Sequence, residues 1–214
     1  MSSLTPDGYL ALPPNGKGQP VLVLHAWWGL NAAIKTFCDR LASEGFVAFA
    51  LDLYHGQVAD TIASAEALGG ALDGRYEEAL AEVAQAVTYL SELYDLSGQG
   101  VALVAFSLGV YYALEHSNAD PEHVSKVVTF YGSRDGDYNK SKAAYLGHFA
   151  ENDVYELPEA VDAMAADLAQ ANRPYTFHTY PGTGHWFFEP DRVDAYEPAA
   201  AELAWQRTIA FLRE

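Results

Sequence analysis

Short continuous apolar segments alternate with amphipathic helical segments along the chain, and this alternation restricts the possible folds more than any other feature. Three apolar runs of strand length cover residues 20–27, 46–54 and 101–106. Because these runs are continuously apolar, we expect both faces of each strand to be buried. Helical patterns follow them, the longest over residues 75–93. The order predicts an α/β fold with a mainly parallel sheet that helices cover on both faces.

Local signals mark the ends of two helices. Asn31 is a favourable N-cap for a helix that we expect to stop at Gly45, and Pro158 fits the first turn of a helix over residues 157–172. The alanine-rich stretch at residues 58–72 is interpreted as a further helix. The remaining expected elements are strands at 126–132, 143–150 and 175–180 and a closing helix at 197–214.

The composition fits one domain over residues 1–214, because half of the residues are hydrophobic and no repeat or linker interrupts the pattern. No apolar run approaches the roughly 20 residues of a membrane span, and the first residues lack the pattern of a signal peptide. We therefore expect a cytoplasmic location. Cys38 is the only cysteine, which excludes an internal disulfide, and its helical surroundings favour a buried, inert thiol.

The charge balance argues against several partners. A formal net charge of −17 repels phosphate backbones and anionic lipids, so we expect a small-molecule substrate and neither nucleic acid nor membrane. The histidines lack the close spacing of metal ligands, so neither a metal nor a cofactor is predicted. The oligomeric state is left open between a monomer and a small homo-oligomer.

The sequence "AFSLG" follows the apolar run that ends at Phe106. It is close to the nucleophile-elbow pattern Gly-x-Ser-x-Gly, with Ala105 in place of the first glycine and Gly109 as the second. In this interpretation Ser107 lies on a tight strand-to-helix turn and is exposed for chemistry. The alternative is that Ser107 is simply a small residue at the end of a buried strand.

A serine hydroxyl needs a base within hydrogen-bonding reach, and the base needs an orienting acid. His185 follows the last expected strand in the glycine-rich loop "YPGTGHWFF", which suits the base. The preceding strand is followed by "ENDVYELP", where we choose Asp153 as the acid and keep Glu151 as the alternative. His25, at the end of the first buried strand, is expected to have a structural hydrogen-bonding role.

The same mechanism requires N–H donors for the oxyanion of the tetrahedral intermediate. The backbone N–H of Leu108, directly after the serine and at a helix N-terminus, is one candidate. The backbone N–H of Trp27, in the loop "HAWWG" after the first buried strand, is the other.

Together these motifs resemble the dienelactone hydrolase family. The stretches "VLVLHAWWGLN", "VALVAFSLGV", "ENDVYELP" and "YPGTGHWF" occur in that family's order and at about its spacing, from about Val21 to the C-terminal helix. The resemblance implies an α/β-hydrolase fold without a large lid domain. It also implies a triad at Ser107, Asp153 and His185, with Trp27 as the second oxyanion donor.

Two departures from the family pattern point to an ordinary serine triad. Founding members carry a cysteine nucleophile where this chain has Ser107, and a glutamate that contacts the resting thiol where this chain has Ala26. The two changes fit each other, because a serine has no thiolate to activate. The resemblance therefore implies a serine-dependent esterase that forms an acyl-enzyme.

Further departures concern the substrate. Founding members hold a carboxylate with two arginines, whereas this chain has Glu189 at one position and only Arg75 near the other. Arg134 and Arg192 remain alternatives. A glutamate near the mouth would repel a carboxylate, so we predict small, neutral esters or lactones. The residues expected to line an apolar pocket, although each also fits plain packing, are Trp28, Tyr54, Tyr131, Trp186 and Phe187. Two other functions remain open: a non-catalytic ligand-binding relative, and a serine hydrolase of another acyl bond.

Overall fold

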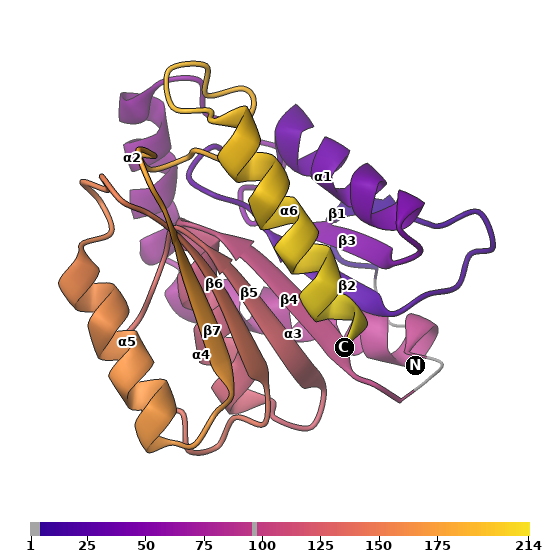
Figure 1. Ribbon diagram of the computed structural model, residues 1–214. Helices are drawn as coiled ribbons and strands as arrows, with labels where there is room; N and C mark the ends of the chain where they lie inside the picture. Colours follow the sequence, from indigo (N-terminus) through magenta and orange to yellow (C-terminus); the bar gives the residue numbers. More distant parts are fainter. Residues whose placement is uncertain (1–4, 96–97) are drawn as a thin grey trace.

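The computed structural model describes residues 5–95 and 98–214, and its centre is a seven-stranded sheet (Figure 1). The strand order is β1-β3-β2-β4-β5-β6-β7, with β1 antiparallel to β3 and every other neighbouring pair parallel. The strands are β1 (Gly8–Ala11), β2 (Pro20–Leu24), β3 (Val47–Leu51), β4 (Val101–Phe106), β5 (Val124–Phe130), β6 (Ala144–Ala150) and β7 (Tyr175–Tyr180).

In the part of the chain that the structure describes, six helices accompany the sheet, namely α1 (Ala32–Ser43), α2 (Ile62–Asp73), α3 (Tyr76–Tyr94), α4 (Leu108–Ala119), α5 (Pro158–Gln170) and α6 (Pro198–Arg213). Buried residues of α1 and α6 pack in one apolar cluster, and those of α3, α4 and α5 pack in a second cluster on the other face. The prediction of a mainly parallel sheet with helices on both faces is therefore confirmed. In the described residues no segment forms a large additional domain.

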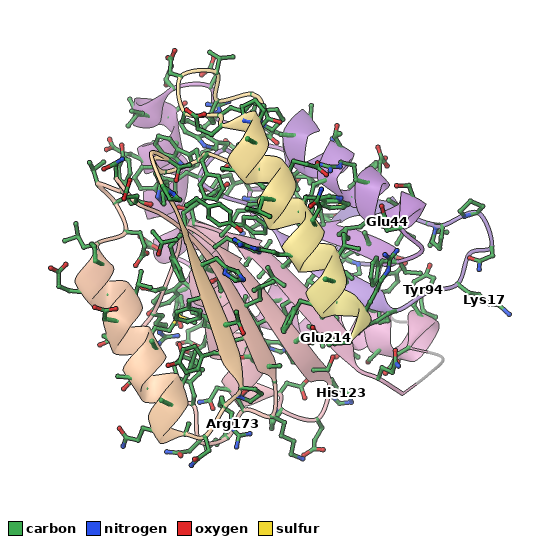
Figure 2. All side chains as sticks on the ribbon, viewed as in Figure 1. Lys17, Glu44, Tyr94, His123, Arg173 and Glu214 are labelled. Carbon is green, nitrogen blue, oxygen red and sulfur yellow. The ribbon has the colours of Figure 1, made fainter. Side chains whose placement is uncertain are left out.

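The central strands explain why their sequence is continuously apolar. Every residue of β2, β3 and β4 is buried, because helices cover both faces of the sheet at these positions. Side chains fill the space between the sheet and the helices, while the charged Lys17, Glu44 and Glu214 lie on the outside (Figure 2). Among the described residues, no helix combines the length and the hydropathy needed to cross a bilayer.

The helix ends follow local chemistry. The side chain of Asn31 accepts a hydrogen bond from the backbone N–H of Ile34, as expected of an N-cap, and Gly45 after the end of α1 has a φ of 95°. The helix expected over residues 58–72 is shorter and starts only at Ile62. Val58 instead pairs with Gly29 in an isolated β-bridge, and Thr61 is the N-cap of the helix.

The parallel arrangement gathers the functional loops. Because β2, β4, β5, β6 and β7 run in the same direction, the loops that follow them meet at one edge of the sheet. The helix α2 lies beyond this edge (Figure 1). Its Gly69 lies so close to Trp27 that an added Cβ would be 3.2 Å from the indole Nε1. The loop after β2 and the helix α2 therefore form one side of whatever site this edge carries.

Candidate active site

Ser107 occupies a sharp turn between β4 and α4. Its φ of 45° and ψ of −112° lie outside the ordinary regions for a residue with a side chain, a conformation that typically costs about 1–3 kcal/mol. The backbone N–H of Ser107 donates to the carbonyl of Phe130 at 2.9 Å. This hydrogen bond fastens the turn to β5, so that the surrounding structure maintains the strained conformation.

The small residues around the turn are required by close backbone approaches. A Cβ on Gly109 would lie 2.7 Å from the carbonyl oxygens of Leu24 and His25. On the other side, a Cβ on Gly132 would lie 3.0 Å from the carbonyl oxygen of Ser107. The turn is therefore packed tightly between β2 and the loop after β5, and it leaves the Ser107 side chain free to face the edge of the sheet.

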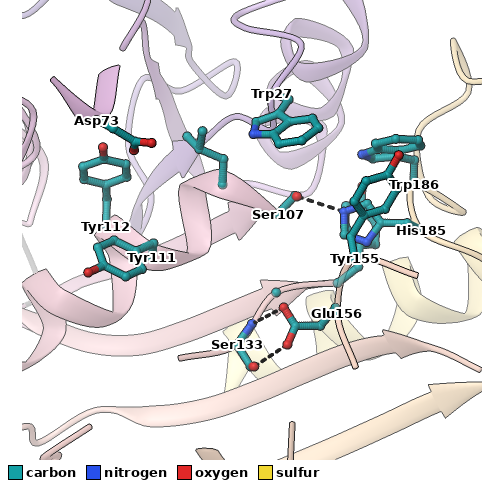
Figure 3. A pocket seen from close by; sticks show the side chains of 13 residues that line it. Trp27, Asp73, Ser107, Tyr111, Tyr112, Ser133, Tyr155, Glu156, His185 and Trp186 are labelled. Atoms are coloured by element: carbon teal, nitrogen blue, oxygen red, sulfur yellow. Dashed lines mark hydrogen bonds between the residues drawn. The ribbon is translucent and has the colours of Figure 1, made fainter. Parts of the chain in front are cut away.

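The side chains of Ser107, His185 and Asp153 form a continuous hydrogen-bonded chain. The Ser107 Oγ lies 2.9 Å from His185 Nε2 (Figure 3), and His185 Nδ1 lies 2.7 Å from Asp153 Oδ2. An ionised carboxylate can only accept, so the proton of the neutral imidazole is on Nδ1 and Nε2 is free to accept from the serine hydroxyl. His185 and Asp153 are both buried.

The carboxylate that contacts His185 is fixed from its other side. The backbone N–H groups of Tyr155 and Glu156 both donate to Asp153 Oδ1 at 2.9 Å. Glu151, the alternative acid, is exposed and accepts from the backbone N–H of Gly182 at 2.8 Å. Of the two acidic residues that the sequence left open, the one that contacts His185 is Asp153.

Two backbone N–H groups at the pocket wall are free. In the described parts of the chain, neither the N–H of Trp27 nor that of Leu108 donates to another protein group, and both residues line the pocket that contains Ser107. Leu108 is the first residue of α4, where a helix leaves its N–H groups unpaired. Both N–H groups are therefore available to a molecule bound in this pocket.

His25 holds the peptide that carries one of these donors. Its Nδ1 lies 2.7 Å from the carbonyl oxygen of Ala26, and its Nε2 accepts from the backbone N–H of Leu53 at 3.2 Å. Burial lowers the pKa of His25, which keeps the ring neutral and leaves Nδ1 as the donor. The Ala26 carbonyl belongs to the same peptide unit as the Trp27 N–H, so His25 fixes the direction of that N–H.

The pocket in front of Ser107 has a volume of about 360 Å³. Trp27 and Leu108 line it, and so do Tyr131 and Trp186 of the five residues expected as substrate contacts. The complete lining is Trp27, Asp73, Ser107, Leu108, Tyr111, Tyr112, Tyr131, Gly132, Ser133, Tyr155, Glu156, His185 and Trp186.

The other three residues expected to contact the substrate do not line the pocket, because they pack behind its wall. Trp28 lies between the ring of Trp186 at 5.1 Å and the guanidinium of Arg192 at 4.0 Å. Tyr54 packs against His25, with the ring centroids 4.8 Å apart. Phe187 is fully buried between two tyrosine rings. These residues support the rings that do line the pocket.

Sequence reasoning missed several lining residues. Tyr111 and Tyr112 lie on the first turns of α4, where a residue four positions after Ser107 shares its helix face. That spacing is a signal that could have identified Tyr111. Tyr155 follows Asp153 by two positions and could have been placed with it. For Asp73 no local signal exists, because only the folding of α2 over the edge brings it to the pocket.

The sequence suggested that Glu189 lies near the mouth of the pocket, but in the structure it lies elsewhere. It is buried, and its Oε1 accepts a hydrogen bond from the Tyr131 hydroxyl at 2.7 Å. Burial raises the pKa of Glu189 to about 8. The loop after β7 folds back under the site and packs this side chain beneath Tyr131, so Glu189 cannot repel a substrate at the entrance.

The arginines considered as substitutes for the family's pair bind elsewhere. Arg75 pairs with Glu82 and donates to the carbonyl of Leu53. Arg134 pairs with Glu115, and Arg192 pairs with Asp191. In the described part of the chain, neither lysine nor arginine lines the pocket.

Two further candidates lie outside the site chemistry. Cys38 is buried within the apolar cluster that includes α1 and α6, as expected, and burial raises its pKa. Over residues 5–95 and 98–214, no group of three or more His, Cys, Asp or Glu side chains is arranged so that it could hold a metal ion.

Comparisons with known proteins agree with the fold. Protein usf of Aquifex pyrophilus is 32% identical over 214 residues, which cover 97% of this chain and 92% of that protein. A carboxymethylenebutenolidase of a Pseudomonas species is 29% identical, with coverage of 96% and 88%. The crystal structure of a dienelactone hydrolase-like promiscuous phosphotriesterase from metagenomic libraries superposes with a TM-score of 0.82 at 21% identity, covering 93% of this chain and 88% of that chain. The sequence profile of the dienelactone hydrolase family matches residues 7–214, and the chain belongs to this family.

Proposed function

We propose that this hydrolase of the dienelactone hydrolase type cleaves small, uncharged carboxylic esters or lactones through an acyl-enzyme on Ser107. The observation that carries the proposal is the continuous chain of hydrogen bonds from Ser107 Oγ through His185 to Asp153. Such a chain lets an alcohol act as a nucleophile at neutral pH, because the base accepts its proton as it attacks.

The proposed reaction proceeds in two halves. Ser107 Oγ attacks the carbonyl carbon while His185 Nε2 takes the hydroxyl proton, and Asp153 stabilises the imidazolium that results. The oxyanion of the tetrahedral intermediate accepts hydrogen bonds from the N–H groups of Trp27 and Leu108. His185 then passes the proton to the leaving alcohol, which in a lactone remains attached to the acyl group. In the second half, His185 activates water and the water releases the acid.

The absence of lysine and arginine from the described pocket wall argues against a substrate that carries a carboxylate. Asp73 and Glu156 also line the pocket, and their negative charge disfavours a substrate carboxylate. The aromatic walls supply apolar contact area for the remainder of the ester.

Substitution of the serine tests the proposal directly. A fluorophosphonate probe should label Ser107 in the wild-type protein, and Ser107→Ala should abolish labelling and lower the turnover of p-nitrophenyl acetate by at least about 10³-fold. Wild-type turnover that persists in Ser107→Ala would refute the proposed nucleophile. A folded protein that neither reacts with the probe nor turns over any ester or lactone would favour the non-catalytic alternative.

The acid has a matched control in the same loop. Asp153→Asn removes the charge that stabilises the imidazolium, and we expect kcat to fall by about 10²–10⁴-fold. Glu151→Gln changes an exposed carboxylate two residues away and should leave kcat within about twofold of the wild type. The assignment of Asp153 would be wrong if the two variants lost activity equally.

A further inference from the structure

The pocket has two unlike sides, with Ser107 between them (Figure 3). His185, Tyr155 and Trp186 lie on one side, whereas Asp73, Tyr111 and Tyr112 lie on the other. A substrate whose carbonyl group is at Ser107 therefore extends part of its structure toward the side formed by α2 and the first turns of α4. The chemistry of that side determines which substituent it accepts.

The charged side chains of the described pocket wall, Asp73 and Glu156, are both carboxylates. Glu156 is held in place, because both the backbone N–H and the hydroxyl of Ser133 donate to its carboxylate. Asp73 is the last residue of α2 and is exposed, and in the described residues no hydrogen bond or ion pair engages its carboxylate. The C-terminal end of a helix adds partial negative charge at the same place.

Aromatic rings stand beside the free carboxylate. Figure 3 shows the hydroxyl end of Tyr112 next to Asp73, with Tyr111 below it and Trp27 across the pocket. Burial first, and then the charge of Asp73, raises the pKa of Tyr112 to about 12, so its hydroxyl stays neutral. Aromatic faces attract cations, but one face of Tyr111 is already covered by the guanidinium of Arg134, 4.2 Å from the ring centroid, and the Tyr112 ring is buried. The charge of Asp73 is therefore the main attraction for a cation on this side.

We propose that this side of the pocket binds a cationic group, such as a quaternary ammonium, and that Asp73 determines the preference for it. The inference rests on the proposed acyl-enzyme mechanism at Ser107 and extends its substrate class from uncharged to cationic esters. A cationic ester is favoured over an uncharged ester of the same shape. Arg134 does not cancel the field, because it pairs with Glu115 outside the pocket lining. Opposite charges about 4 Å apart in water attract enough for roughly a fivefold preference.

Two thioesters of equal shape test the proposal. Acetylthiocholine and S-(3,3-dimethylbutyl) thioacetate differ only in a quaternary nitrogen or a quaternary carbon, and both release a thiol that is followed by colour. At low salt we expect kcat/KM for the cationic thioester to exceed that for the neutral one by about fivefold or more. Asp73→Asn should reduce the ratio toward one, while Glu66→Gln, an exposed carboxylate elsewhere on α2, should retain it.

The outcomes separate this inference from the proposed function. Two outcomes would refute the cationic site but not the proposed esterase activity. One is hydrolysis of both thioesters through Ser107 at equal kcat/KM, and the other is an equal loss of preference in Asp73→Asn and Glu66→Gln. If neither thioester is hydrolysed, the cationic site is tested by ligand binding instead of by activity. Quenching of tryptophan fluorescence in Ser107→Ala should show choline binding at least about fivefold more tightly than 3,3-dimethylbutan-1-ol, with the difference lost when Asp73→Asn is added. Equal binding of the two would overturn the inference.

Discussion

Replacing the buried carboxyl of Glu189 by an amide should change how the stability of the protein depends on pH. Glu189 is 2% exposed, its Oε1 accepts from Tyr131, and its Oε2 has no partner in the described residues. Burial is the main reason why its pKa is raised from 4.5 to about 8, and the nearby charge of Asp191 raises the pKa further. The hydrogen bond from Tyr131 and the charge of Arg192 lower the pKa in part. In Glu189→Gln the carbonyl oxygen can still accept from Tyr131, but the ionisation is lost.

The sign and the size follow from proton linkage. Between pH 4.5 and about pH 8 the folded protein keeps a proton on Glu189 that the unfolded chain releases, so the free energy of unfolding falls as the pH rises. Each pH unit in this window contributes about 1.4 kcal/mol. The full window therefore corresponds to a loss of about 5 kcal/mol as an upper bound, a loss that the variant does not suffer.

Urea unfolding of the two proteins across this window is the appropriate measurement. The other titrating groups, among them the buried His25 and His148, contribute nearly equally to both proteins and cancel in the difference. The free energy of unfolding of Glu189→Gln minus that of the wild type should increase steadily with pH, toward about 5 kcal/mol. Glu66→Gln, an exposed carboxylate on α2, should show a flat difference. Parallel curves for Glu189→Gln and the wild type would refute the argument that this carboxyl is protonated in the fold.

Two further substitutions test the support of the candidate site. Gly109→Ala places a Cβ 2.7 Å from the carbonyl oxygens of Leu24 and His25. The backbone shift that this requires should lower the free energy of unfolding by about 1–3 kcal/mol, which is measured as a lower urea midpoint. An unchanged midpoint would show that the turn has room for the methyl group. His25→Phe removes the hydrogen bond to the Ala26 carbonyl, and we expect kcat per probe-titrated site to fall about tenfold with little change in KM, less than the loss of an oxyanion donor itself. An unchanged kcat would mean that the Trp27 N–H needs no such support.

The strands could be predicted because burial on both faces leaves a continuous apolar record in the sequence. The run at residues 101–106 coincides with β4, and Asn31 and Pro158 start their helices as expected. The helix α2 starts later than expected, because Val58 pairs with Gly29. The capping box of Thr61 and Ser64 marks its actual start and is a local signal that the sequence interpretation did not use. A contact between two loops leaves no periodic pattern.

The same limit applies to the site. Strand order alone predicts that the loops with Ser107, Asp153 and His185 share one edge of the sheet, and their side chains lie within hydrogen-bonding distance there. The position of Glu189 depends on its contact with Tyr131, which is 58 residues earlier in the chain. Sequence spacing therefore indicated where the loops meet, but not which side chains turn inward beneath them.

The burial of Cys38 determines how the protein responds to chemical attack. Its side chain is completely inaccessible and burial raises its pKa, so the thiolate that alkylating agents and peroxides attack does not form. The only sulfhydryl of the sequence lies on the buried face of α1, so the protein exposes no thiol to these reagents. Iodoacetamide and hydrogen peroxide inactivate hydrolases that use a cysteine, but they should leave the thiol of Cys38 in the folded protein unmodified.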